Sequence, residues 1–313
     1  ITSDITRPMP TYTVMPALLD ELYAGGARPE DITLVFALGS HRAQTPEEMR
    51  HLAGEQAWAQ IRCVDSDPAD VVHLGVTSAG TPVDITRVVA EADRRICLGN
   101  IEYHYFAGYS GGAKAIMPGV STPSAIQSNH SMMVRESACA GNLEGNPLRR
   151  DIEEAAAMCG ADYILNVVLD EHKPVSYTHL TLPTNRVVLD EHKQIVCAVA
   201  GDVTLAHREG CRYLDRLYRK DIDRRADIVI VSQGGAPKDL NLYQTQKALD
   251  NAKHAVAKGG VVILVGSCRE GLGGTTFQEW MTTMPSPESM VERIGRDFQL
   301  GGHKAAAIAM VLQ

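Results

Sequence analysis

The chain has 313 residues, of which 44% are hydrophobic and 22% charged, as in globular proteins large enough for two α/β domains. Its net charge of −8 and pI near 5.8 argue against a nucleic-acid or anionic-membrane surface. No apolar run approaches the roughly 20 residues of a membrane span, and no signal peptide is visible. Seven scattered cysteines without a C-x-x-C pair indicate buried thiols in a reducing cytoplasm.

The chain begins at Ile1 without methionine and ends at Gln313 inside an alanine-rich helical pattern. We therefore expect both ends to be cut. Near the start, two prolines stop any helix and hold an extended loop, in which Asp4 and Arg7 form either a solvated surface pair or part of a site. Residues 12–24 then predict an amphipathic helix that ends at a Gly-Gly pair.

The first α/β unit shows strands followed by polar loops. Residues 32–38 are mostly apolar, which predicts a buried parallel strand, and His41 follows on a short loop before a capping box at 45–48. Polar groups just past the carboxyl end of a strand lie where open α/β sheets bind ligands. His41 is therefore a candidate site residue, with an ordinary loop histidine as the alternative. Further strands are predicted at 71–76 and 94–99.

A glycine-rich loop carries most of the candidate chemistry. Ser110, Gly111 and Gly112 precede a helix-like run, and their successive free N–H groups would suit an anion such as a phosphate. Lys114 follows at once and can act as a charge on that phosphate or as a nucleophile. The loop does not match the Walker A pattern. A Gly-rich turn without function is the alternative interpretation.

Two histidines flank this loop. His104 follows the strand predicted at 94–99, and His130 falls in a helix predicted at 122–133. Both are candidate acid/base groups or metal ligands. A further helix is predicted at 147–159, ended by a glycine.

An unchanged seven-residue repeat interrupts the chain. Val-Val-Leu-Asp-Glu-His-Lys occurs at 167–173 and again at 187–193, and two identical copies do not make a solenoid. If residues 174–193 are left out, the strand predicted at 163–169 joins the apolar segment at 194–200 through a hairpin turn. We therefore expect residues 174–193 to be a non-native insertion, looped out of the fold, whose histidines carry no chemistry.

A second α/β unit follows a charged helix at 203–219. Residues 226–232 and 261–265 predict strands, and residues 240–258 predict the helix between them, ended by the glycines at 259–260. A β-α-β order predicts a parallel strand pair with a right-handed crossover.

Three polar residues lie near the start of that helix. Gln244 and Lys247 share one helix face, beside Tyr243, and solvated helix residues are the alternative interpretation. We expect an α/β protein with the active site in a cleft between two domains. A cofactor-binding domain spans 1–220, and an incomplete, Rossmann-like domain that closes over the substrate spans 221–313.

Five sequence patterns together resemble the nickel-dependent lactate racemase family, in the same order and over nearly the whole chain apart from 174–193. They are Ser-Asp-x-Thr-Arg-Pro at 3–8, Gly-Ser-His-Arg at 39–42, His-x4-Tyr-Ser-Gly-Gly-x-Lys from 104 to 114, His130, and Tyr-Gln-x-x-Lys at 243–247. The resemblance implies an isomerase that inverts C2 of a 2-hydroxy acid, lactate or a relative. It also implies a nickel pincer nucleotide, a pyridinium-3,5-dithiocarboxylic acid mononucleotide, and the proteins that synthesise it.

The resemblance implies a role for each matched residue. Lys114 would tether the cofactor through a thioamide, His130 would bind nickel, and His41 and His104 would be paired acid/base groups. The cofactor and substrate pocket would include Asp4 and Arg7, and the residues holding the substrate from the second domain would be Tyr243, Gln244 and Lys247. Removing the C2 hydrogen as hydride requires a base for the hydroxyl proton, and two histidines on opposite faces would serve both enantiomers.

Two other functions stay open. A zinc hydrolase would use His41, His104 and His130, although no H-E-x-x-H or comparable spacing is present. A catalytically inactive nucleotide-binding fragment would agree with the cut ends and the foreign insertion.

Overall fold

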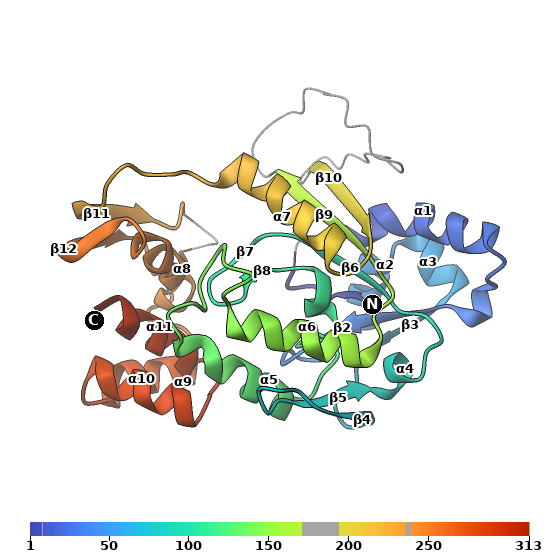
Figure 1. The fold of residues 1–313 in the computed structure, drawn as a ribbon, viewed down its shortest axis with the longest axis horizontal. Coiled ribbons are helices and arrows are strands. Elements are labelled where there is room, and N and C mark those ends of the chain that lie inside the picture. Colours follow the sequence, from blue (N-terminus) through green and yellow to red (C-terminus); the bar gives the residue numbers. More distant parts are fainter. Residues whose placement is uncertain (8, 171–193, 236–238, 313) are drawn as a thin grey trace. The chain divides into compact units, whose positions relative to one another are not determined.

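A computed structural model describes the fold of residues 1–7, 9–170, 194–235 and 239–312 (Figure 1). The chain divides into two compact units. The first comprises residues 1–104, 108–129 and 148–219, and the second comprises residues 105–107, 130–147 and 220–313. The predicted insertion at 174–193 lies outside the described residues.

Two three-stranded sheets form the centre of the first unit. In one, β1 (Thr2–Ser3), β2 (Thr33–Ala37) and β3 (Arg62–Asp65) run parallel in that order. The other has the order β10-β9-β6, with β6 (Ile96–Asn100), β9 (Tyr163–Asp170) and β10 (Gln194–Gly201). The ammonium of Ile1 donates to Ile96 O (2.8 Å) and its carbonyl accepts from Leu98 N (2.7 Å), which joins the two sheets beside β1.

The strands before and after the predicted insertion pair with each other, as the sequence predicted. β9 and β10 are antiparallel, and Asp170 stands opposite Gln194 at the open end of the ladder. β6 pairs with β9 in parallel. The hydrogen-bonded ladder between β9 and β10 therefore extends to the residues next to the segment predicted to be foreign.

Three helices bury one face of these sheets. They are α1 (Thr11–Ala24), α2 (Pro46–Ala53) and α3 (Glu55–Gln60). Leu19 of α1 and Phe36 of β2 are both fully buried in this core, which also includes Leu98 and Val167. The predicted capping box is confirmed, because Thr45 Oγ1 accepts from Glu48 N while the Glu48 carboxylate accepts from Thr45 N.

The remaining elements that begin in the first unit are β4 (Val71–Val76), β5 (Pro82–Thr86), α4 (Arg87–Ala90), β7 (Tyr103–His104), β8 (Gly108–Tyr109), the 3₁₀ turn η2 (Gly112–Ala115), α5 (Pro123–Ser131), α6 (Pro147–Cys159) and α7 (Leu205–Tyr218). A buried carboxylate connects some of them. Asp151 of α6 accepts from Thr81 Oγ1 (2.8 Å) after β4, from Asn129 Nδ2 (2.7 Å) of α5, and from Thr77 Oγ1. These bonds fix the β4–β5 hairpin and α5 against α6.

The second unit contains the predicted β-α-β arrangement. β11 (Ala226–Ser232) and β12 (Val256–Val265) are parallel, with α8 (Leu242–Ala252) between them in the chain. The predicted helix end at 259–260 is wrong. Gly259 (φ +78°) and Gly260 lie inside β12, where the ladder register shifts, and a Cβ on Gly260 would come 2.8 Å from Asp227 O. The glycines therefore allow a strand irregularity and do not end a helix.

One face of the β11–β12 pair is apolar and exposed. The alternating side chains on this face are Ile228 (61% exposed), Ile230 (70%), Val261 (54%), Ile263 (45%) and Val265 (53%). Parallel sheets usually bury both faces. These five side chains make the β11–β12 face the most conspicuous apolar surface of the described strands.

Three further helices and one turn complete the second unit. They are η3 (Met132–Val134), α9 (Thr275–Thr283), α10 (Pro287–Arg296) and α11 (Gly302–Leu312). Trp280 is fully buried against Gly302, where a Cβ would come 2.6 Å from the indole, so the two helices approach closely. The described residues confirm an α/β fold. Among the described helices, none has both the length and the apolar character needed to cross a bilayer.

Candidate active site

An acid–histidine pair occupies the carboxyl edge of the β1-β2-β3 sheet. Asp4 follows β1 directly, and His41 lies in the turn after β2, where its N–H donates to Leu38 O. His41 Nδ1 lies 2.7 Å from Asp4 Oδ2. Asp4 is 2% exposed, whereas the His41 side chain is 38% exposed. The parallel strands thus bring together two residues 37 positions apart at the edge where such sheets bind ligands.

The pair has a defined proton arrangement. Burial alone would raise the pKa of Asp4, but hydrogen bonds from His41 and Thr6 and the charges of His41 and Arg7 outweigh burial and lower it. Thr6 Oγ1 donates to the other Asp4 oxygen at 2.7 Å. Because an ionised carboxylate only accepts, His41 Nδ1 carries the proton toward Asp4. In the neutral ring, Nε2 is then the basic nitrogen.

A second set of hydrogen bonds holds the two loops in place. Gln44 donates to Asp65, at the end of β3, through both its backbone N (2.8 Å) and its side-chain Nε2 (2.9 Å). Gln44 Oε1 accepts from Ile5 N at 2.9 Å. Gln44, in the loop after β2, therefore connects the loop after β1 to the end of β3. Sequence reasoning missed Gln44 and Asp65.

His104 lies on a hairpin that is anchored to α7. It is half-buried at the end of β7, opposite Gly108 of β8. Tyr103 OH and Tyr109 OH, from the same hairpin, both donate to Asp215 of α7, at 2.7 and 2.6 Å. The anchored hairpin gives His104 a fixed backbone, while its pairing with His41 stays a prediction.

The glycine loop is more constrained than predicted. Ser110 N donates to Glu102 O (2.8 Å), and Gly112 N donates to Asn166 Oδ1 (2.7 Å). The prediction that these residues offer free N–H groups to a phosphate is therefore wrong for Ser110 and Gly112. Gly111 has φ +73°, and a Cβ there would come 2.6 Å from Asn166 Oδ1. The glycines fit the loop onto β9, and the N–H groups of Ser110 and Gly112 are used within the protein.

Lys114 lies on η2 in a positively charged environment. Its side chain is half-buried, and no hydrogen bond or ion pair reaches its Nζ from the described part of the chain. The pKa of Lys114 lies well below its usual value, because burial disfavours the ammonium and the charges of Arg7 and Arg149 add to that effect. Arg7 is exposed, and its N–H donates to Asp4 O at 3.2 Å. The charge of Arg7 thus acts on both Asp4 and Lys114.

His130 belongs to the second unit and sits among aromatic rings. Its ring lies 4.9 Å from the Phe106 ring and 5.6 Å from the Phe298 ring, both edge-to-face. It is half-buried at the end of α5. An apolar surrounding of this kind fixes the orientation of an imidazole.

The three predicted substrate residues occupy the first turns of α8. Asn241 caps this helix by accepting from Gln244 N at 3.1 Å. Gln244 is half-buried and Lys247 is exposed. The Tyr243 ring lies 5.5 Å from that of Phe277, and burial raises the pKa of its hydroxyl.

A buried lysine beside Tyr243 escaped the sequence analysis. Lys304 of α11 is 5% exposed, and its Nζ lies 4.4 Å from the centre of the Tyr105 ring and 5.7 Å from that of Tyr243. Nζ also donates to Gln246 Oε1 at 2.9 Å. An alanine-rich helix with one lysine gives no sequence signal for a buried cation, because only the packed structure places both rings against it.

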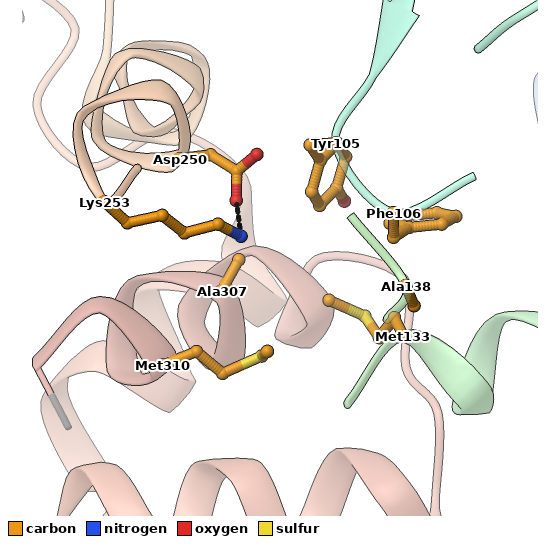
Figure 2. A pocket seen from close by; sticks show the side chains of 8 residues that line it. All are labelled: Tyr105, Phe106, Met133, Ala138, Asp250, Lys253, Ala307 and Met310. Carbon is orange, nitrogen blue, oxygen red and sulfur yellow. Dashed lines mark hydrogen bonds and ion pairs between the residues drawn. The ribbon is translucent and has the colours of Figure 1, made fainter. Parts of the chain in front are cut away.

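Figure 2 shows a small pocket within the second unit. Tyr105, Phe106 and Met133 line one side, while Asp250 of α8 and Lys253, just after this helix, form an ion pair of 2.6 Å at its other side. The pocket has room for about one water molecule. No predicted site residue lines it, so it does not mark the candidate active site.

One alternative prediction was a zinc centre made by His41, His104 and His130. Among the described residues, no group of three or more His, Cys, Asp or Glu side chains is arranged to hold a metal ion. A metal bound by His130 would need most of its ligands from elsewhere.

Comparison with known proteins decides the family. Residues 1–141 match the lactate racemase N-terminal domain, and residues 222–299 match the lactate racemase C-terminal domain. The structure superimposes on that of the lactate racemase apoprotein from Thermoanaerobacterium thermosaccharolyticum with a TM-score of 0.86 and 32% identity, covering 99% of this chain and 72% of that one. This chain belongs to the lactate racemase family.

Two curated lactate racemases extend this result. The protein from T. thermosaccharolyticum is 35% identical over 305 residues, and that from Lactiplantibacillus plantarum is 34% identical over 301 residues. These alignments cover 95% and 94% of this chain but 66% and 65% of the relatives, so the chain spans about two thirds of their length. A Thermotoga maritima crystal structure shares the fold at 20% identity, with a TM-score of 0.67 over 99% of this chain and 76% of that one. The resemblance predicted from the sequence motifs is confirmed.

Proposed function

We propose that this protein inverts the C2 centre of a 2-hydroxy acid, lactate or a relative, using a nickel pincer nucleotide. The family supports racemisation, and the Asp4–His41 pair is the observation that carries the proposal to this chain. A buried, ionised carboxylate holds the proton on His41 Nδ1, which leaves Nε2 as the base. The same carboxylate stabilises the imidazolium after Nε2 takes the hydroxyl proton.

The residues present fit the cofactor. Lys114 would hold the nucleotide, because a lowered pKa favours the nucleophilic form of the amine and the charges of Arg7 and Arg149 favour an anionic group. His130 would supply the protein ligand to nickel. When bound, the cofactor would supply a hydride acceptor for the C2 hydrogen. Ser110, Gly111 and Gly112 would shape the cofactor pocket through the backbone that precedes Lys114.

The remaining roles follow from charge and position. His104 would act as the second acid/base group, so that each enantiomer meets one histidine. Arg7 would attract the substrate carboxylate, and Tyr243, Gln244 and Lys247 would bind the substrate from the second unit. All seven cysteines are free thiols, which supports a cytoplasmic location where cofactor-synthesising proteins would load the enzyme.

The test combines cofactor content with racemisation. Protein co-expressed with a cofactor-making pathway should carry about one nickel per chain and a nucleotide-sized mass increase. Lys114→Ala should lose the mass increase, and His130→Ala should lose nickel. His41→Ala and His104→Ala should retain the cofactor but lose interconversion of D- and L-lactate.

A matched control separates chemistry from surface effects. His73 Nδ1 lies 2.6 Å from Asp84 Oδ1, which makes a more exposed acid–histidine pair with a similar distance on the β4–β5 hairpin. His73→Ala should leave racemisation unchanged. Full racemisation in both His41→Ala and His104→Ala would refute the roles of these histidines, and folded protein with neither nickel nor a mass increase would favour an inactive fragment.

A further inference from the structure

A buried ammonium in the second unit contacts two tyrosines that lie far apart in the sequence. The Nζ atom of Lys304 lies 4.4 Å from the centre of the Tyr105 ring and 5.7 Å from that of Tyr243. It also donates to Oε1 of Gln246, which is fully buried on α8. Burying an ammonium costs free energy unless other groups replace its water. Here an amide oxygen and two aromatic faces do so.

Close packing fixes the start of α11, from which this lysine extends. Gly302, the first residue of the helix, lies directly on the buried Trp280 indole, with no room for a Cβ. Gly301 N donates to His303 Nδ1 at 3.0 Å, and Lys304 N donates to Gly301 O at 3.0 Å. The Lys304 side chain therefore begins from a backbone with little freedom to move, so its ammonium can hold other groups in place.

Tyr243 is enclosed by side chains from several elements. Its ring meets the Phe277 ring of α9 edge-to-face at 5.5 Å and the His303 ring of α11 edge-to-face at 6.4 Å. A Cβ on Gly273 would come 2.8 Å from Tyr243 Cβ, so the chain before α9 also packs on this residue. Lys304 adds an electrostatic contact to this packing, because a cation is attracted to the face of an aromatic ring.

The other ring belongs to the segment of chain that follows His104. Tyr105 is the next residue along the chain, and its ring meets the Phe106 ring edge-to-face at 4.5 Å. Phe106 in turn packs against the His130 ring. One ammonium therefore contacts both the chain directly after a proposed acid/base group and a tyrosine proposed to bind the substrate.

We propose that Lys304 is a positioning residue, whose ammonium holds the Tyr105 and Tyr243 rings in the arrangement that binds the 2-hydroxy acid. A cation against the face of a phenol ring also draws electron density from it, which makes the Tyr243 hydroxyl a stronger donor toward a carboxylate. The role is expressed in substrate affinity, because Lys304 acts through Tyr243 and not on the C2 hydrogen. This inference rests on the proposed function, which assigns Tyr243 to the substrate.

Steady-state racemisation of lactate by the cofactor-loaded enzyme tests this role. Lys304→Met removes the charge and keeps a side chain of similar length, so KM for both enantiomers should rise about tenfold while kcat changes less than about threefold. Lys304→Arg keeps a cation that stacks on aromatic rings, and it should return KM to within about threefold of wild type. Lys258→Met removes an exposed lysine of the same unit and should leave both constants unchanged. All variants should carry as much nickel as wild type.

A double-mutant cycle in cofactor-free protein tests the contact itself. Tyr105→Leu removes the ring that faces Lys304, whereas Tyr105→Phe keeps a ring there. In urea denaturation, the effects of Lys304→Met and Tyr105→Leu on the unfolding equilibrium constant should be non-additive by about fivefold or more. The matched cycle with Tyr105→Phe should be additive within about twofold, because the aromatic face is retained. In the loaded enzyme, Tyr105→Leu should raise KM and Tyr105→Phe should not.

Two results would overturn this inference and leave the proposed function intact. One is an unchanged KM in folded Lys304→Met beside an active wild type; if that variant does not fold, an unchanged KM in Tyr105→Leu decides the matter instead. The other is additivity in the Tyr105→Leu cycle, which would show that the ammonium does not hold the ring. By contrast, a cofactor-loaded wild type that racemises neither lactate nor a relative would refute the proposed function and, with it, the role of Lys304 in substrate binding.

Discussion

Replacing Asp4 by Asn tests the acid–histidine pair most directly. The change keeps the shape of the side chain and removes the charge that accepts from His41 Nδ1 and Thr6 Oγ1. A hydrogen bond to a charged group contributes about 1.5–3 kcal/mol. Because the His41 side chain is 38% exposed, solvent screening reduces this contribution, and we expect a loss of about 1–2 kcal/mol in the free energy of unfolding.

The effect should depend on pH with a definite sign. The pKa of Asp4 is lowered in the folded protein. Its stabilisation is therefore complete above the unfolded-state pKa of about 4 and is lost as pH falls through the lower folded-state pKa. Urea denaturation should show the full difference between wild type and Asp4→Asn at pH 6 and a smaller difference at pH 3.

The control and the catalytic readout complete this test. Asp84→Asn alters the His73 pair, in which the His73 side chain is 59% exposed, and should cost below about 1 kcal/mol. Loss of the correct His41 tautomer should lower kcat for racemisation by about 10²–10⁴-fold in Asp4→Asn only. Equal destabilisation by the two variants, or a difference for Asp4→Asn that does not change with pH, would refute the reasoning.

Three further outcomes are expected. Deleting residues 174–193 should preserve circular dichroism and thermal stability, because β9 and β10 already pair as neighbouring strands; a large loss of stability would show that the segment is native. Gly111→Ala should cost about 2–4 kcal/mol in urea denaturation, since its Cβ would meet Asn166 and φ is positive. Replacing both Ile230 and Ile263 by Thr should reduce concentration-dependent association in analytical ultracentrifugation, because both are exposed on the β11–β12 face.

The sequence was most informative where a local pattern fixes a structure. The apolar run at 32–38 became β2, the Thr45 capping box formed as predicted, and the β-α-β order produced a parallel pair. The glycines at 259–260 led to a wrong prediction of a helix end. Glycine occurs both at helix ends and at strand irregularities, and only the strand register of β12 shows which one is present here.

Buried polar partners could not be found in the same way. Asn166 lies in an apolar strand and Arg149 in an ordinary amphipathic helix, and no spacing connects either to the glycine loop. The prediction of free N–H groups failed for this reason, since their acceptors come from residues far away in the sequence. The motif resemblance named both Asp4 and His41 as site residues, but the hydrogen bond between them was not predicted and is found only in the structure.

The division of the chain bears on how this protein can be dissected. The polypeptide crosses between the two units at 104/105, 107/108, 129/130, 147/148 and 219/220. A gene fragment starting at 220 would omit η3 and the Phe106 and His130 rings, which pack within the second unit near Phe298. Protease cleavage at 219/220 would likewise leave η3, Phe106 and His130 on the N-terminal fragment. A single cut in the polypeptide therefore cannot separate the two units, because each is built from three segments of the chain.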